Sequence, residues 1–280
     1  MRQTAKAFAP GNISCVFKIY EHQDPRQMGS YGIGFTINEG VIVETLHCNV
    51  STNKNSIFFN DEEITFPTVE QVIRSLTKDN IKVHISSLLP LGGGFGLSGA
   101  SALATAYALN ILLDLKKSHQ ELAMIAHVAE VENKTGLGDV INQYHGGFLI
   151  KNKLDKDAIN RVSTKLALAG TSVYCASFGK VSTKSVLTNV ALREQINTAA
   201  TIALGKVNDH MTFEDIITIS KDFAIQSGLL TDKKTKETIQ SIENSNGKAS
   251  MIMLGNAVFS TIPFPGATKF VISDTGAHEV

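Results

Sequence analysis

A glycine cluster in the middle of the chain carries the clearest chemical signal in the sequence. Four of the five residues from Gly92 to Gly96 are glycine, so this backbone can adopt positive φ angles and bring its N–H groups close to a ligand. A segment rich in Ala and Leu follows directly and predicts a helix, whose N-terminus favours anions. The cluster is therefore typical of a phosphate-binding loop, with a ligand-free glycine turn as the alternative. The predicted contact residues are Pro90, Gly92, Gly93, Gly94, Phe95, Gly96, Leu97, Ser98, Gly99 and Ala100.

Two common phosphate-binding motifs fit this cluster poorly. A P-loop requires Gly-x-x-x-x-Gly-Lys-Ser/Thr, and the sequence has no lysine between Pro90 and Leu115. The dinucleotide-binding pattern Gly-x-Gly-x-x-Gly is present at Gly94, Gly96 and Gly99. However, no second strand that ends in Asp or Glu follows about 20 residues later. The sequence therefore excludes a P-loop and leaves a dinucleotide-dependent dehydrogenase as a weak alternative.

The cluster resembles the phosphate loop of the GHMP kinases, a family that includes galactokinase, homoserine kinase and mevalonate kinase. The family motif is Pro-x-Gly-x-Gly-Leu-Gly-Ser-Ser-Ala. The residues that match it are Pro90, Gly92, Gly94, Gly96 and Ser98, while Phe95 replaces Leu and Leu97 replaces the first Ser. Residues 9–13 resemble the family's N-terminal Ala-Pro-Gly-Lys motif, and residues 135–139 resemble its Ser-Gly-x-Asp loop. The similarity spans residues 8 to about 259 and is greatest toward members that phosphorylate pantoate.

The resemblance implies a two-domain α+β fold with the active site in the cleft between the domains. Residues 1–155 are expected to form the N-terminal ATP-binding domain and residues 156–280 a C-terminal α+β domain, because the polar stretch 151–160 favours a boundary. The implied reaction is ATP-dependent phosphorylation of the 4-hydroxyl of (R)-pantoate in coenzyme A biosynthesis. The alternatives are a GHMP kinase for mevalonate or homoserine, and a nucleotide-binding module without catalysis. A homodimer is also implied.

The same resemblance implies a Mg²⁺ ion held by Ser98 and Glu130. Mg²⁺ prefers oxygen ligands and usually takes only one or two carboxylates from protein. Glu132 lies two residues further along the same predicted helix, so it faces another direction and only one of the two glutamates can serve. Without a metal, Ser98 would cap the following helix and Glu130 would pair with Lys134 on the surface.

Asp139 resembles the carboxylate that lies against the acceptor hydroxyl in mevalonate kinase-like members. A carboxylate there can accept the hydroxyl proton as the bond to phosphorus forms. Without that role, an Asp in a glycine turn stabilises the turn through its own backbone. The sequence departs from the family at Asn12, where several members have a lysine, so either Asp139 works alone or another cation replaces that lysine. The family's third glycine motif is reduced to Gly255.

Four more residues are candidates for binding the substrate. Pantoate carries a carboxylate, hydroxyls and a gem-dimethyl group, so its pocket needs a cation, hydrogen-bonding groups and an apolar wall. Lys151 follows a predicted strand and is the candidate for the carboxylate. His127 precedes Glu130 by three residues and shares its helix face. Ser30 and Thr183 are candidates for hydroxyl contacts, although a core histidine, a solvated lysine and turn-capping hydroxyls are the structural alternatives.

Hydrophobic periodicity and capping signals predict the elements that position these residues. Strand patterns span residues 32–46, 81–88, 146–150, 171–178 and 269–273, and an apolar segment covers 251–259. Helical patterns span residues 98–115, 118–132, 191–205, 212–228 and 231–246. Ser118 with Glu121 and Thr212 with Asp215 form capping pairs, and Gly228 is a stop signal. The glycine cluster therefore joins a strand to a helix, and Asp139 lies in a loop between a helix and a strand.

Composition narrows the class of partner. The 280 residues include 26 Lys and Arg and 26 Asp and Glu, so the formal net charge is zero. This balance argues against nucleic acid or an anionic membrane and favours a small-molecule partner. Pro10 and Gly11 interrupt the first apolar residues too early for a signal peptide, and no segment approaches the about 18 apolar residues of a membrane span. The three cysteines lack a Cys-x-x-Cys motif, which fits a reducing, cytoplasmic location.

Overall fold

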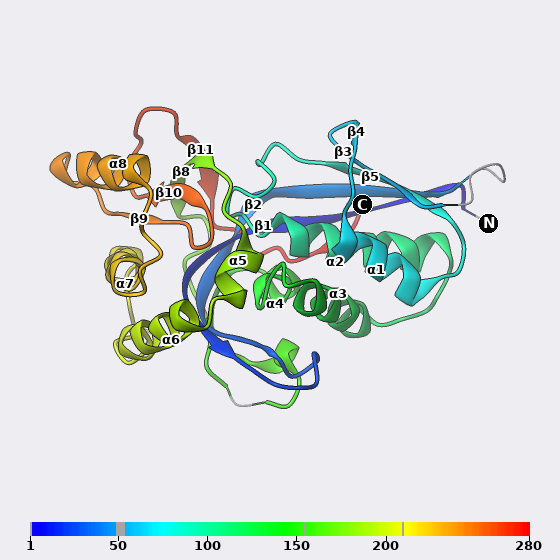
Figure 1. The fold of residues 1–280 in the computed structure, drawn as a ribbon. Coiled ribbons are helices and arrows are strands. Elements are labelled where there is room, and N and C mark those ends of the chain that lie inside the picture. Colours follow the sequence, from blue (N-terminus) through cyan, green and yellow to red (C-terminus); the bar gives the residue numbers. More distant parts are fainter. Residues whose placement is uncertain (1, 49–53, 154, 209) are drawn as a thin grey trace.

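Two β-sheets with helices packed against them form the protein (Figure 1). The computed structural model describes all residues except 1, 49–53, 154 and 209. In the described residues one sheet has eight strands and the other has four, which confirms the expected α+β class. The strands are β1 (Thr4–Tyr20), β2 (Gly29–His47), β3 (Ser56–Phe59), β4 (Glu62–Glu63), β5 (Ile81–Ser86), β6 (Phe148–Lys151), β7 (Val162–Leu166), β8 (Ser172–Gly179), β9 (Ala249–Met251), β10 (Asn256–Ser260), β11 (Thr268–Val271) and β12 (His278–Glu279). The helices are α1 (Pro67–Leu76), α2 (Leu97–Leu112), α3 (His119–Asn133), α4 (Asp139–His145), the 3₁₀ turn η1 (Ala158–Asn160), α5 (Thr183–Thr188), α6 (Val190–Leu204), α7 (Phe213–Gln226) and α8 (Lys233–Asn244).

The larger sheet is built around two long antiparallel strands, β1 and β2. Its order is β12-β1-β2-β5-β3-β4, and β6 pairs with the first half of β2 and with β7. The pairing of β1 with β2 shifts register between Pro10 and Asn12 and again between Ser14 and Val16. Bulges of this kind redirect side chains and are frequent beside active sites. They flank Asn12 and Ser14, both of which belong to the site described below.

The larger sheet and helices α1 to α4 form one half of the molecule, and α2 lies at the centre of this half. It packs against β1, β2, α1 and α3, and almost all of its residues are buried, as a helix rich in Ala and Leu on every face requires. Helix α3 begins with the predicted capping box. The Glu121 N–H donates to Ser118 Oγ at 3.3 Å, and the Ser118 N–H donates to the Glu121 carboxylate at 2.8 Å.

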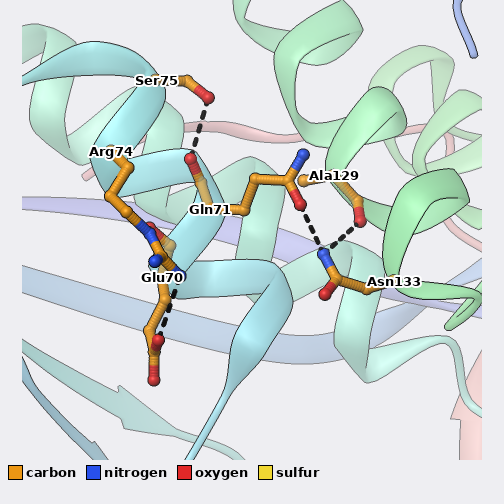
Figure 2. A network of polar contacts seen from close by, with 6 residues as sticks. All are labelled: Glu70, Gln71, Arg74, Ser75, Ala129 and Asn133. Atoms are coloured by element: carbon orange, nitrogen blue, oxygen red, sulfur yellow. Dashed lines mark hydrogen bonds and ion pairs between the residues drawn. The ribbon is translucent and has the colours of Figure 1, made fainter.

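An amide pair joins the neighbouring helices α1 and α3 (Figure 2). Asn133 Nδ2 donates to Gln71 Oε1 at 2.6 Å and to the Ala129 carbonyl at 2.8 Å. This contact holds the C-terminal turn of α3, the turn that carries Glu130, against α1.

The smaller sheet has the order β11-β8-β10-β9 and is antiparallel throughout. Helices α7 and α8 pack on it, while α6 and α7 also contact β1, so the first strand takes part in both halves of the molecule. The capping box of Thr212 and Asp215 forms as predicted. Gly228 follows the end of α7 at a φ of +71°, the left-handed conformation in which helices commonly stop.

The predicted helices and strands are confirmed to within three residues at each end. The apolar segment 251–259 is not one element, because a turn separates β9 from β10. Strand β1 and helices α4 and α5 carry no clear periodicity, because β1 is covered on both faces along its middle and the two helices have only seven and six residues. Helix α1 is also absent from the predicted elements, although Val69, Val72 and Ile73 lie on its buried face at helical spacing. The proposed division at residue 155 falls between β6 and β7, which pair with each other, and it stays a prediction.

No helix among the described residues is both long enough and apolar enough to cross a bilayer.

Candidate active site

A cavity of about 510 Å³ lies where loops from both halves of the molecule converge. Its lining includes the glycine loop, which is the glycine cluster at residues 92–96, and the loop at 135–139. Strands β1, β2 and β6 contribute to it, and so do residues 181–184 after β8 and 253–254 after β9. The predicted site residues in its lining are Ser30, Gly92, Gly94, Phe95, Gly96, Leu97, Ser98, Asp139, Lys151 and Thr183. The predicted residues that lie behind this lining are Pro90, Gly93, Gly99, Ala100, His127 and Glu130.

The glycine loop has a backbone conformation that requires glycine at three positions. Gly92, Gly94 and Gly96 have φ angles of +82°, +91° and +63°, a region that residues with a side chain rarely adopt. Gly96 is the N-cap of α2, so Ser98 is the second residue of this helix and does not cap it. The loop and the amino end of α2 therefore face the cavity together, an arrangement suited to binding an anion.

The segment around Gly255 closes against the glycine loop from the other half of the molecule. A Cβ atom at Gly255 would lie 2.5 Å from the Gly93 carbonyl oxygen, and one at Gly94 would lie 3.0 Å from Gly255 Cα. Leu254 lines the cavity with a φ of +64°. The reduced third glycine motif thus keeps the one glycine that the close backbone approach requires.

Glu130 reaches from α3 into the interior behind the glycine loop and is 1% exposed. A Cβ atom at Gly136 would lie 2.4 Å from its Oε2, and one at Gly99 would lie 2.8 Å from the same atom. Thr135 Oγ1 donates to Oε1 at 3.2 Å, whereas Oε2 has no hydrogen-bond partner within the described structure. Two glycines therefore make room for a carboxylate that has one unpaired oxygen.

Burial and the nearby Asp139 carboxylate raise the pKa of Glu130 to about 8, and the hydroxyls of Ser98 and Thr135 act against this rise. Ser98 Oγ donates to Thr68 Oγ1 at 3.3 Å, and Thr68 Oγ1 lies 3.0 Å from Thr135 Oγ1. The carboxyl group of Glu130 thus has hydroxyl groups as neighbours, and no ion pair with a basic residue forms among the described residues. A cation at this position would favour its ionised form.

Glu132 faces away from the cavity. Gln71 Nε2 donates to its carboxylate on the outer side of α3, and the side chain is exposed. No ion pair between Glu130 and Lys134 forms within the part of the chain that the structure describes. Of the two glutamates, Glu130 is the one directed to the site, and the surface pairing considered as its alternative does not occur.

Asp139 is the first residue of α4 and lines the cavity next to the glycine loop. A Cβ atom at Gly96 would lie 3.1 Å from its Cγ atom. Asn12 Nδ2 donates to Asp139 Oδ1 at 2.6 Å. Desolvation raises the pKa of Asp139 above its ordinary value, while the hydrogen bond from Asn12 and the charge of Lys151 oppose the rise.

Lys151 and Ser30 meet above the backbone of Gly138. Lys151 Nζ donates to the Gly138 carbonyl at 3.0 Å, and the residue is 4% exposed. A Cβ atom at Gly138 would lie 2.3 Å from Ser30 Oγ and 2.5 Å from Lys151 Nζ, so a side chain there would displace both groups. Burial lowers the pKa of Lys151 to about 8, with the charge of Arg161 adding to the shift and that of Asp139 opposing it.

His127 and Thr183 differ in their relation to the cavity. His127 is 1% exposed in the interior, where its Nε2 lies 2.9 Å from the Met28 carbonyl, and burial lowers its pKa to about 4. This geometry gives no support to a substrate contact and corresponds to a core histidine. Thr183 is half-buried, follows the N-cap Ser182 at the start of α5 and lines the cavity.

Two polar residues of the site, Ser14 and Asn142, are not among those predicted from the sequence. Asn142 Nδ2 donates to Asn12 Oδ1 at 2.7 Å, and Ser14 Oγ accepts from Asn12 Nδ2 at 3.2 Å. Ser14 lies two residues after Asn12, so strand alternation would have placed both on one face. Asn142 lies on the seven-residue helix α4, which is too short to give a periodic signal.

These groups together suit phosphoryl transfer to a hydroxyl of a small anionic acceptor. The glycine loop and the amino end of α2 offer N–H groups to phosphates. The Asp139 carboxylate is placed to accept a proton, and Lys151 offers a positive charge on the same side of the cavity. The cavity is large enough for the reacting ends of two small substrates.

Comparisons with known proteins agree with this chemistry. The family described as GHMP kinases N terminal domain matches residues 65–147. The chain is 36% identical to a pantoate kinase of Methanocaldococcus jannaschii over 90% of each chain. It is 33% identical to a pantoate kinase of Methanospirillum hungatei, with coverage of 91% of this chain and 86% of the relative. Among solved structures it is similar to a phosphotransferase related to the CoA biosynthesis pathway, with a TM-score of 0.85, 23% identity and coverage of 99% and 98%.

Proposed function

The chain belongs to the GHMP kinase family, and on this premise we propose that it is a pantoate kinase. It transfers the γ-phosphoryl group of ATP to the 4-hydroxyl of (R)-pantoate and yields (R)-4-phosphopantoate and ADP. The observation that carries this proposal is the convergence of three groups in one cavity: the glycine loop, the Asp139 carboxylate and the Lys151 ammonium. They are the groups that a triphosphate, a reacting hydroxyl and a substrate carboxylate require.

The protein contributes to the reaction chiefly by positioning and by compensating charge. Backbone N–H groups between Gly92 and Gly96, with the amino end of α2, hold the phosphates of ATP. Asp139 accepts the proton of the 4-hydroxyl as the hydroxyl oxygen attacks the γ-phosphorus. The bond between the γ-phosphorus and the bridging oxygen breaks, and its electron pair leaves with ADP.

The remaining groups of pantoate match the rest of the cavity. Lys151 binds the carboxylate, and the hydroxyl of Ser30, which meets Lys151 above Gly138, supports it. Apolar side chains of Ile33 and Leu137 line the same cavity and offer a wall for the gem-dimethyl group. Thr183 is the proposed hydroxyl contact from the other half of the molecule.

Glu130 and Ser98 fit the family's magnesium ion. Glu130 Oε2 is buried without a hydrogen-bond partner in the described structure, and the Ser98 hydroxyl lies next to this carboxyl group. Among the described residues no three His, Cys, Asp or Glu side chains form a metal-binding group. One carboxylate and one hydroxyl are nevertheless sufficient for Mg²⁺, which otherwise binds waters and phosphate oxygens. When bound, the ion neutralises negative charge on the phosphates.

We expect Glu130→Gln and Ser98→Ala to increase the Mg²⁺ concentration needed for half-maximal ADP formation by about tenfold or more. Each change removes an oxygen ligand, and one charge-assisted contact contributes about 1.5–3 kcal/mol. The measurement is a Mg²⁺ titration at fixed ATP. Glu132→Gln is the matched control, because Glu132 lies on the outer face of α3. An unchanged Mg²⁺ dependence in both variants would contradict the assignment of these ligands.

An ADP-release assay with several acceptors tests the substrate. Turnover is expected with (R)-pantoate, and rates close to background with mevalonate, homoserine and galactose. Turnover of another acceptor without any of pantoate would reject the substrate assignment but keep the kinase. Absence of ADP with all four acceptors would instead favour a nucleotide-binding module.

The proposal has two further parts, the oligomeric state and the location. We propose a homodimer, which light scattering of the purified protein would test. We also propose a cytoplasmic location, because Cys15, Cys48 and Cys175 are all free thiols, as a reducing compartment requires.

A further inference from the structure

Asn12 connects three parts of the site through polar contacts. Its backbone N–H donates to the Phe95 carbonyl of the glycine loop at 2.9 Å. Its Nδ2 donates to Asp139 Oδ1 at 2.6 Å, and its Oδ1 accepts from Asn142 Nδ2 at 2.7 Å. Asn12 is 0% and Asn142 1% exposed, so water does not compete for these bonds.

The chemistry of Asp139 fixes the orientation of both amides, since Asn142 Oδ1 at the other end has no hydrogen-bond partner among the described residues. An ionised carboxylate only accepts hydrogen bonds, so Asn12 must present its NH₂ group to Asp139. Its carbonyl oxygen then faces Asn142, which must present its own NH₂ group. Without that donor, the buried Asn12 carbonyl oxygen is left unpaired, and only the bond to Asp139 and the 3.2 Å bond from Asn12 Nδ2 to Ser14 Oγ still orient the amide. The position of the amide against the carboxylate is then held less firmly.

The surrounding backbone is shaped to hold Asn142 in this place. Asn142 lies three residues after Asp139 on α4, so both side chains point to the same face of the helix. A Cβ atom at Gly34 of β2 would lie 2.6 Å from Asn142 Nδ2, so the strand leaves room for the amide only because residue 34 is glycine. The bulges of β1 on either side of Asn12 direct its side chain toward both partners.

We propose that Asn142 is a positioning residue for phosphoryl transfer, which acts through Asn12 to hold the Asp139 carboxylate in its reactive orientation. The inference rests on the proposed function. Asn12 stands at the position of the lysine in the family's N-terminal motif, but its amide supplies no charge. Lys151 and Glu130 are the charged groups that face Asp139, and neither depends on Asn142 for a hydrogen bond.

Kinetics of Asn142→Leu test this role, because leucine has a similar size and no donor. We expect kcat to fall about 100-fold, as small misplacements of reacting groups can cost, while KM for ATP and for pantoate stays within about threefold of wild type. The double variant with Asn12→Leu should lose no more kcat than Asn12→Leu alone, since Asn142 acts through Asn12. Additive losses, or a rise in both KM values with kcat unchanged, would overturn the proposal.

Asn110→Leu is the matched control for loss of an asparagine. Its amide makes two hydrogen bonds to the backbone of Lys117, away from the site, so its kcat should match that of wild type. If Asn142→Leu does not fold, Asn142→Ala removes the same donor without adding atoms, and the same predictions apply to it.

A spectroscopic measurement separates this proposal from the identity of the substrate. In ¹⁵N-asparagine-labelled protein without ligands, the short bond to Asp139 should shift one side-chain N–H proton of Asn12 downfield. Asn12→Leu assigns this signal by removing it. Asn142→Leu should move the signal upfield toward ordinary amide positions and speed its exchange with water. An unchanged signal would overturn the proposal even if pantoate proved to be the substrate, and a changed one would support it even if another acceptor were used.

Discussion

Asp139→Asn is expected to abolish most phosphoryl transfer and to leave ATP binding nearly intact. The amide has almost the shape of the carboxylate but cannot accept the proton of the acceptor hydroxyl, a role that contributes about 10²- to 10⁴-fold in rate. The measurements are kcat for pantoate phosphorylation and the dissociation constant of ATP by calorimetry. We expect kcat to fall by about 10³-fold and the dissociation constant to change less than threefold.

Two features of the site make this a clean substitution. The new amide can still accept from Asn12 Nδ2 through its own oxygen, so the contact that replaces the family's lysine persists. The Asp139 carboxylate is one of the causes that raise the pKa of Glu130, so its removal makes ionisation of Glu130 easier and does not weaken that ligand. Glu132→Gln serves again as a control for loss of a nearby carboxylate. A kcat of Asp139→Asn within about threefold of wild type would remove Asp139 from the chemistry.

The parts of the site that the sequence predicts are those whose residues lie close together along the chain. The glycine loop has positive φ angles at alternate positions, and a run of glycines before a helical segment predicts such a backbone directly. The capping boxes of α3 and α7 are equally local, because each requires only two residues three positions apart. These elements could be placed from periodicity and capping alone.

Spacing predicts the face of a helix that a side chain occupies, but not what packs on that face. His127 and Glu130 share the buried side of α3, as their separation by three residues indicates. The two side chains are one helical turn apart and have different surroundings. The Glu130 carboxylate lies behind the glycine loop, whereas the His127 ring contacts the Met28 carbonyl. The role of Met28 depends on how the segment between β1 and β2 folds back, which no local pattern encodes.

The replacement for the family's lysine was also beyond local sequence information. Asn12, Asn142 and Lys151 come from β1, α4 and β6, which the tertiary fold brings around Asp139. In the sequence Asn142 belongs to a short unpatterned segment, and Lys151 looks like any lysine at the end of a strand. Lys151 differs from such a surface lysine because it is only 4% exposed and donates to the Gly138 carbonyl.

Lys151→Met is expected to lower kcat/KM for pantoate by about 10- to 100-fold, with KM for ATP little changed. The ammonium is buried in the cavity, and one charged hydrogen bond contributes about 1.5–3 kcal/mol. An analogue with a hydroxymethyl group in place of the carboxylate should be a poor substrate for wild type. Lys151→Met should lose most of this discrimination, because the group that recognises the carboxylate is gone.

The pH dependence of the reaction gives an independent check on the same lysine. Because burial lowers the pKa of Lys151 to about 8, the charged form that binds the carboxylate predominates below that pH and is lost above it. In wild type, kcat/KM for pantoate should therefore decline as the pH rises through about 8. Lys151→Arg keeps its charge over this range and should remove the decline. Lys153→Met, at an exposed position two residues away, should keep the wild-type profile. A decline that persists in Lys151→Arg would assign the titration to another group and exclude Lys151 as its source.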